Sequence, residues 1–507
     1  MEGGKSIVIG VDQGTTNTKA VAVDRAGKVL AQASRPIASA APQLGWVEQD
    51  PRAMLENVVT CVREVLGATG NSAGAIAGIG IANQTETLVI WDRRSGEPVL
   101  PAIVWKCRRG AEEIAPLQNE QATALILDRT GLSLDPTFTA PKLKWVFTHR
   151  PAVAEGLSKG DYLFGTVDCW LIWSLTGGAV YATDASNASR TMLLDIDSVA
   201  WEPKLAELFG LGLARWPEVR RSAGSFGETA TVFFDGAIPI TAAVGDQQAS
   251  LFGHGCFECA QMKVTYGTGA FLWVNAGGNR PFAIAGDGLL RTIAWKLDRP
   301  TYAVEGFVMY AGAILDWLAS RLAVVGGGPA VARQAEQAGT SDGVVLVPAF
   351  QGLAAPWWNP EVRAGLLGMT EATTSGNLCH AALEALCYQI RALLGAVERA
   401  TGREIETIKV DGGPTRSDYL MQLQADILQR PLAISAFDSM TPYGAALMAG
   451  LGAGLWSRLG ELERLVTPAR TVRPDPTTAC HWEKGYKDWF AAAEALLAYY
   501  GGRHRSS

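Results

Sequence analysis

Three glycine-rich turns, each placed directly after a strand-like run, constrain the fold of this chain more than any other feature of its sequence. They are Asp12-Gln13-Gly14-Thr15-Thr16, Tyr266-Gly267-Thr268-Gly269 and Asp411-Gly412-Gly413. When strands deliver such turns to a common edge, the backbone N–H groups and hydroxyls of the turns can surround a triphosphate. A single Gly-Thr turn is more often an ordinary hairpin, so the prediction of a phosphate site rests on the whole set.

The pattern around the first turn returns around the second. Apolar runs from Ile7 to Asp12 and from Thr18 to Asp24 predict a hairpin, which a third strand and a helix from Pro51 to Leu66 follow. Near the second turn, Gln261 to Tyr266 and Phe271 to Asn275 repeat the strand–turn–strand order. The pattern therefore predicts an α/β protein of two actin-like (ribonuclease-H-like) domains, divided near residue 255.

Composition narrows the class of ligand. The formal charge of -6 is spread without basic blocks, so we expect neither a nucleic-acid partner nor binding to an anionic membrane surface. Neither an apolar leader nor a run of about 18 apolar residues is present, so we expect a cytoplasmic protein with no membrane partner. The P-loop and Rossmann fingerprints are both missing, which leaves a small-molecule site of another kind.

Several further stretches match a known family in its order of motifs. They are Gly10 to Thr16, Gly45-Trp46-Val47-Glu48-Gln49-Asp50-Pro51, Gly165-Thr166-Val167-Asp168, Thr183 to Thr191, Gly245-Asp246-Gln247-Gln248, Tyr266 to Gly269, Pro348 to Leu353, Val410 to Gly413, Leu420-Met421-Gln422 and Gly444-Ala445-Ala446. Over nearly its whole length the sequence resembles the FGGY carbohydrate kinases, and within them the glycerol kinases. The resemblance implies ATP-dependent phosphorylation of a small polyol or sugar in a catalytic cleft between the two domains. It assigns the polyol mainly to residues 1–254 and ATP mainly to residues 255–507, and it allows a homodimer or homotetramer.

The resemblance also assigns the nucleotide site. Thr15, Thr16 and Asn17 offer short donors to phosphate oxygens, Lys19 adds a cation, and Asp12 can hold hydrated magnesium. Mg²⁺ is assigned to Asp12 together with Asp246. The remaining positions implied for ATP are Gly267, Thr268, Gly312, Asp316, Gly413 and Ser417.

Asp246 is the implied general base. An alcohol is a weak nucleophile near neutral pH, and a carboxylate beside it can accept its proton as the new P–O bond forms. The alternative is that Asp246 only caps a helix that begins at Gln247. The implied polyol contacts are Thr85, Glu86, Trp105, Thr137, Asp246 and Gln247, with Trp105 as an apolar wall.

The implied polyol site departs from the glycerol kinases at three positions. Thr85 replaces an arginine, Thr137 a tyrosine and Cys107 a carboxylate. These changes remove volume and hydrogen-bonding groups, which favours a four- or five-carbon polyol or ketose over glycerol. The alternative is that Lys106 or Arg108 replaces the lost donors and that glycerol remains the substrate.

Two other functions remain open for a chain with these motifs. An actin-like ATPase switch would share the fold and the first turn, but it has no use for Trp105, Glu86 and Asp246. A non-catalytic sugar sensor would tolerate the changed pocket, but the retained Asp12, Asp246 and Thr268 argue against it. Polyol-dependent release of ADP would distinguish a kinase from both.

Overall fold

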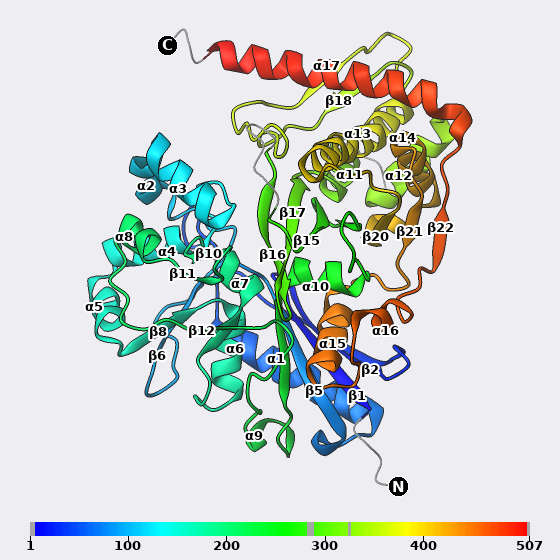
Figure 1. Cartoon of the computed structure of the whole chain (residues 1–507). Coiled ribbons are helices and arrows are strands. Elements are labelled where there is room, and N and C mark those ends of the chain that lie inside the picture. Colours follow the sequence, from blue (N-terminus) through cyan, green and yellow to red (C-terminus); the bar gives the residue numbers. More distant parts are fainter. Residues whose placement is uncertain (1–5, 281–287, 323–325, 504–507) are drawn as a thin grey trace.

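Two large sheets organise the chain into two lobes (Figure 1). The computed structural model describes residues 6–280, 288–322 and 326–503. The first sheet has the strand order β13-β5-β1-β2-β3, and the second has the order β16-β17-β15-β14-β20-β21-β22. Each sheet carries helices, which confirms the predicted α/β class with two halves of similar design.

The first sheet mixes hairpin and parallel pairing. Its strands are β1 (Ile7–Gln13), β2 (Asn17–Asp24), β3 (Val29–Pro36), β5 (Ile76–Asn83) and β13 (Ile240–Gly245). The first three strands pair antiparallel, whereas β5 pairs parallel with β1 and with β13. Helix α1 (Pro51–Thr69) packs on β2 and β3, and helix α15 (Thr441–Gly452) packs on β1 and β5. Because helices cover both faces, β1 and β5 are nearly continuous apolar runs.

Helix α15 lies unusually close to the first sheet. A Cβ at Gly10 would lie 1.9 Å from the carbonyl oxygen of Pro442, and one at Gly80 would lie 2.1 Å from that of Ala445. Glycine at these two strand positions is therefore what admits the helix. Residues 441–452 come after residue 255 in the sequence, but they pack on the first sheet. The predicted division near residue 255 therefore does not assign this helix to the lobe that it contacts.

The second sheet is built around the second and third turns. Its strands are β14 (Met262–Tyr266), β15 (Ala270–Gly277), β16 (Leu290–Lys296), β17 (Pro300–Val308), β20 (Ile408–Gly412), β21 (Leu432–Ile434) and β22 (Arg470–Val472). Its helices are α11 (Gly312–Arg321), α12 (Gly327–Ala338), α13 (Ser375–Thr401), α14 (Asp418–Leu428) and α17 (Ala479–Arg503). Parallel pairing of β14 with β20 brings the two turns to one end of the sheet.

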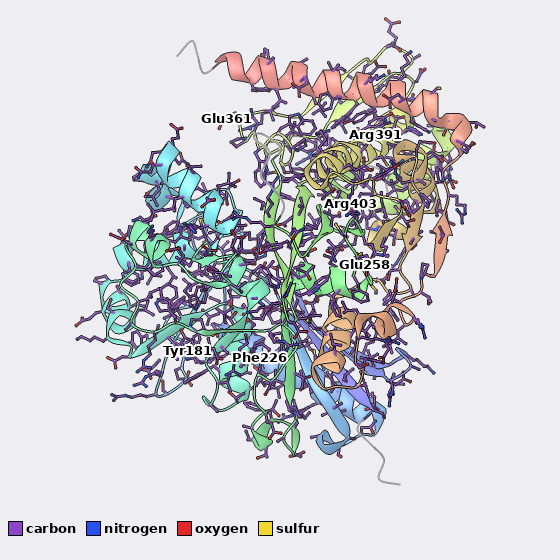
Figure 2. All side chains as sticks on the ribbon, viewed as in Figure 1. Tyr181, Phe226, Glu258, Glu361, Arg391 and Arg403 are labelled. Carbon is purple, nitrogen blue, oxygen red and sulfur yellow. The ribbon has the colours of Figure 1, made fainter. Side chains whose placement is uncertain are left out.

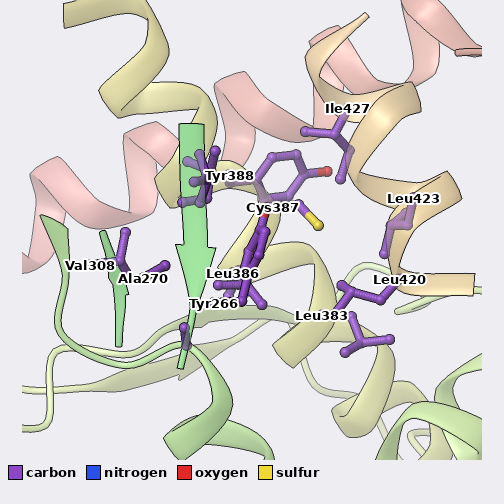
Figure 3. Packing of buried hydrophobic residues seen from close by; sticks show 14 of the residues in the cluster. Tyr266, Ala270, Val308, Leu383, Leu386, Cys387, Tyr388, Leu420, Leu423 and Ile427 are labelled. Atoms are coloured by element: carbon purple, nitrogen blue, oxygen red, sulfur yellow. The ribbon is translucent and has the colours of Figure 1, made fainter. Parts of the chain in front are cut away.

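Helix α13 forms the centre of the second core. Thr374 and Asn377 form a capping box at its start, and Gly402 ends it in the left-handed conformation. Its buried face packs with side chains of β14 and α14, including Tyr266 and Leu420 (Figure 3). Arg391 of this helix is labelled in Figure 2. It pairs with Glu483 of α17, which links the long terminal helix to the lobe.

Truncating the buried Leu386 of α13 should test this core. Leu386 has no exposed surface, so Leu386→Ala should lower the free energy of unfolding by about 2–5 kcal/mol through lost burial and a cavity. Urea denaturation followed by circular dichroism measures the change. The control is Leu366→Ala, because Leu366 is 38% exposed and should cost less than about 1 kcal/mol. Equal losses for the two variants would contradict the packing described.

The rest of the first lobe extends away from the first sheet. It contains β6 (Val89–Asp92), β8 (Tyr162–Gly165), α3 (Glu120–Thr130), α4 (Thr139–His149), α5 (Pro151–Lys159), α6 (Val167–Leu175), α7 (Ala185–Ser189) and α8 (Pro203–Phe209). Strand β6 pairs with β8 rather than with the main sheet. Across the described part of the chain, no helix has the length and apolarity needed to span a membrane.

Candidate active site

The carboxyl ends of three parallel strands meet at one edge of the first sheet. In the register of the sheet, Gln13 of β1 lies beside Asn83 of β5, and Asn83 lies beside Gly245 of β13. Asp12, Glu86 and Asp246 are found at or just beyond these strand ends. Strand order therefore brings together three carboxylates that are widely separated in sequence.

Asp246 is the first residue of helix α10 (Asp246–Gly253). The N-cap position belongs to Gly245, and no side chain caps this helix. The interpretation of Asp246 as an N-cap is therefore wrong, because the strand runs directly into the helix at Gly245. The Asp246 carboxylate accepts the N–H of Gln247 at 2.7 Å, which leaves it further acceptor capacity.

The electrostatic surroundings of Asp246 and Asp12 favour proton uptake by their carboxylates. Burial, with the neighbouring charges of Asp12 and Glu86, raises the pKa of Asp246 to about 8. Burial likewise raises the pKa of Asp12 to about 6, although Lys19 opposes the shift. A carboxylate in such a setting is a stronger base than an exposed aspartate.

Glu86 is held from two sides. Its Oε1 accepts from Nε of Arg190 at 2.6 Å, and its Oε2 accepts from the Thr85 hydroxyl at 2.6 Å. Arg190 also pairs with Glu305 of β17 at 2.8 Å, so it links the two lobes. Glu86 has φ 64°, a left-handed conformation that is costly for this residue type and is typical of functional sites.

Trp105 contacts the first glycine-rich turn. Its indole N–H donates to the Thr15 hydroxyl at 2.8 Å, and its backbone N–H donates to the Thr87 hydroxyl at 3.1 Å. The predicted polyol wall and the predicted phosphate turn therefore touch. Trp105 uses its polar edge for this contact, so only its ring faces remain for an apolar role.

The side chains considered as substitutes for the lost arginine, Lys106 and Arg108, do not donate to Glu86, which bonds Thr85 and Arg190 instead. Lys106 is exposed, and the guanidinium of Arg108 pairs with Asp135 at 3.2 Å. Asp135 also accepts the backbone N–H of Thr137 at 2.8 Å, which shapes this loop. Beneath it, the buried Lys142 donates to the carbonyl oxygens of the same loop, and burial lowers the pKa of Lys142 to about 7.

The second and third turns form one neighbourhood. Tyr266 and Gly412 are partners in the parallel register, and a Cβ at Gly412 would lie 1.9 Å from the carbonyl oxygen of Tyr266. The backbone N–H of Gly312, at the start of α11, donates to the carbonyl oxygen of Gly267 at 2.9 Å. Four predicted nucleotide residues lie in this neighbourhood: Gly267, Thr268, Gly312 and Gly413. Thr268 and Gly413 are exposed, so a ligand can reach them.

The other predicted nucleotide residues are less tightly grouped. Asp316 is exposed on α11, and the Ser417 hydroxyl accepts the N–H of Leu420 as the cap of α14. In the first turn, the N–H of Gly14 donates to the carbonyl oxygen of Asn17 at 3.0 Å, and Thr16 is exposed. Lys19 lies opposite Asp12 in the β1–β2 register.

Three buried residues that the sequence reasoning did not single out complete the site. Lys263 of β14 donates to Oε1 of Gln247 at 2.5 Å and to the Thr265 hydroxyl at 2.9 Å. Arg190 and Ser186 come from the stretch Thr183 to Thr191, and the Ser186 hydroxyl accepts the N–H of Gly245 at 2.9 Å. A lysine inside a short, largely buried strand was the available signal for Lys263.

The fit of a magnesium ion can be judged from the carboxylates present. No group of three or more His, Cys, Asp or Glu side chains that could hold a metal occurs among the described residues. Mg²⁺, however, keeps several waters and uses one or two carboxylates with substrate phosphates. Oδ1 of Asp12 is buried without a hydrogen-bond partner, and the charge of Asp12 is felt by Asp246. This pair suits such an ion.

Comparison with known proteins decides the family. Residues 7–253 match the N-terminal domain of the FGGY family of carbohydrate kinases, and residues 262–453 match its C-terminal domain. This chain belongs to the FGGY carbohydrate kinases. The prediction made from its motifs is confirmed.

Proteins similar to this FGGY kinase align with it over almost its full length. A glycerol kinase of Francisella philomiragia is 41% identical over 98% of this chain and 99% of its own, and one of Xanthomonas axonopodis is 40% identical over the same shares. The solved structure of Plasmodium falciparum glycerol kinase with ADP superposes with a TM-score of 0.90 at 29% identity, covering 98% of this chain and 99% of that one. This FGGY kinase therefore has the two-domain, actin-like fold of its family.

Proposed function

We propose that this FGGY kinase transfers the γ-phosphoryl group of ATP to a hydroxyl of a small polyol or sugar, with Asp246 as the general base. The observation that carries the proposal is the meeting of Asp246, Asp12 and Glu86 at one edge of the first sheet, next to Lys263 and the turns of the second. In the proposed step the substrate oxygen bonds to the γ-phosphorus and its proton passes to Asp246. The bond from the γ-phosphorus to the bridging oxygen breaks, and ADP leaves.

The nucleotide assignment follows from the turns. Backbone N–H groups and hydroxyls of residues 14–17, 267–269 and 412–413 suit phosphate oxygens, and the exposed Thr268 suits the γ-phosphate. Magnesium, held by Asp12 and Asp246, would neutralise charge on the transferred group. The structure of the P. falciparum relative was solved with ADP, which supports adenine nucleotide binding by this kinase.

The substrate assignment weighs two observations. Relatives about 40% identical to this chain are glycerol kinases, which supports a polyol. Arg108 pairs with Asp135 and Lys106 is exposed, while Thr85 bonds Glu86 and is shorter than the arginine it replaces, which supports a substrate longer than three carbons. We therefore infer a four- or five-carbon polyol or ketose in preference to glycerol.

A substrate panel tests this inference. The specificity constant kcat/KM for ADP release should be roughly tenfold higher with a tetritol, pentitol or ketopentose than with glycerol. Thr85→Arg should restore bulk and donors to the pocket and shift the preference towards glycerol. Arg108→Ala should leave the preference unchanged. Highest activity on glycerol would reject the preference for a larger substrate, and loss of polyol affinity in Arg108→Ala would show that Arg108 replaces the lost donors.

The same assay of ADP release distinguishes a kinase from the two alternative functions. A switch ATPase would release ADP without dependence on polyol, and a sugar sensor would bind polyol without releasing ADP. A cytoplasmic location and a homodimeric or homotetrameric state are part of the proposal, and light scattering after size-exclusion chromatography measures the assembly.

A further inference from the structure

Lys263 is a buried lysine at the junction of the two lobes. It has no exposed surface, and it lies on β14 just before the second glycine-rich turn. Its ammonium donates across the junction to Oε1 of Gln247 on α10, at 2.5 Å. Lys263, close to the phosphate turn in sequence, therefore contacts Gln247, the residue after Asp246.

The chemistry of this contact determines which end of the Gln247 amide faces the lysine. A lysine ammonium has three donors and no acceptor, so the amide end against it must be the oxygen. Burial lowers the pKa of Lys263 to about 8, so the group remains mostly charged at pH 7. The NH₂ end of Gln247 is consequently turned away from Lys263, and within the described part of the chain no group accepts a hydrogen bond from it.

The same ammonium reaches the third turn through one hydroxyl. Thr265 accepts from Lys263 at 2.9 Å and donates to Oδ1 of Asp411 at 2.6 Å. Oδ2 of Asp411 accepts the backbone N–H of Met440 at 3.1 Å. Asp411 opens the turn Asp411-Gly412-Gly413, so a continuous chain of hydrogen bonds joins the helix of Asp246 to the phosphate turns.

We infer that Lys263 is a positioning residue that holds the Gln247 amide with its NH₂ group towards the polyol. The substrate atom facing Gln247 must then be an acceptor, either a hydroxyl oxygen or a carbonyl oxygen. This inference rests on the proposed function, because it assumes a polyol beside Asp246. It assigns to Lys263 a role in substrate specificity that acts only through Gln247.

Matched variants test the role of Lys263. Gln247→Glu keeps an oxygen acceptor for Lys263 but replaces the NH₂ donor, so the KM for the polyol should rise roughly tenfold or more. Lys263→Met frees the amide and should also raise the polyol KM several-fold, with the KM for ATP changing less than about twofold. Lys409 is the register partner of Lys263 on β20 and donates to the carbonyl oxygens of His254 and Gly255. Lys409→Met is the control for loss of a lysine at this sheet, and its polyol KM should match the wild type.

A double-mutant cycle separates positioning from mere structural support. If Lys263 acts through Gln247, the pair Lys263→Met and Gln247→Ala should raise the polyol KM no further than Gln247→Ala alone. Additive effects, or a lowered melting temperature in Lys263→Met with an unchanged polyol KM, would overturn the inference. If Lys263→Met does not fold, Gln247→Glu decides, since an unchanged KM would show that the NH₂ group does not face the substrate.

Assays of the wild type distinguish a failure of this inference from a failure of the proposed function. No ADP release with any polyol would reject the proposed function and this inference with it. An active wild type whose Gln247→Glu and Lys263→Met variants keep the wild-type polyol KM would reject only the role of Lys263.

Discussion

Asp246→Asn is expected to lower kcat for polyol-dependent ADP release by roughly 10²–10⁴-fold, the usual contribution of a general base. The amide has the size of the carboxylate but cannot take the hydroxyl proton. The KM for the polyol should change by less than about threefold, because Glu86 and Gln247 remain. A coupled assay of ADP release at saturating ATP and magnesium measures both constants.

The control for Asp246→Asn is the same substitution at an exposed site. The side chain of Asp298 is 90% exposed and pairs with Arg221 at the surface, so Asp298→Asn should retain the wild-type kcat. A kcat within tenfold of the wild type in Asp246→Asn would show that another group or water accepts the proton. A large rise in polyol KM with little change in kcat would make Asp246 a binding residue instead.

Asp12→Asn is expected to have the second largest effect, through the metal. A bound magnesium ion contributes several kcal/mol of charge stabilisation in phosphoryl transfer, so weakening its site should lower kcat/KM for ATP by roughly 10²-fold. The magnesium concentration for half-maximal rate should rise as well, because a neutral amide is a poorer ligand for Mg²⁺ than a carboxylate.

Magnesium titration of the wild type and Asp12→Asn measures this effect. The stability of the fold should not fall, since Oδ1 of Asp12 makes no hydrogen bond within the protein and burial opposes its charge. Excess EDTA should abolish the wild-type rate. If Asp12→Asn kept the wild-type magnesium dependence, the ion would have to be held by other groups.

The two expected effects have a common origin in strand order. Asp12 is the penultimate residue of β1 and Asp246 follows β13, and β5 lies between these strands in the sheet. The charge of Asp12 contributes to the raised pKa of Asp246. The same edge therefore serves both for metal binding and for proton transfer.

The family and the local structure were readable from the sequence because they depend on neighbours along the chain. Apolar runs on either side of a turn predicted the β1–β2 hairpin, and helical spacing predicted a helix from Pro51 to Leu66, where α1 runs from Pro51 to Thr69. At the third turn the sequence signal has a clear backbone cause, because Gly412 adopts φ 102°, a conformation that favours glycine. The order of the glycine-rich turns, with the other motifs, identified the FGGY kinases.

Only the tertiary structure decided which distant side chains meet. Arg190 on Glu86 joins residues 104 positions apart, and Thr265, which accepts from Lys263, reaches Asp411 across 146 positions. Helix α15 returns to the first sheet from the far end of the chain, through contacts at Gly10 and Gly80. Periodicity carries no record of these pairings, because they depend on strand order and on the need of each buried charge for a partner. The sequence thus determined the elements and the family, whereas the fold determined the partners of Glu86, Gln247 and Asp411.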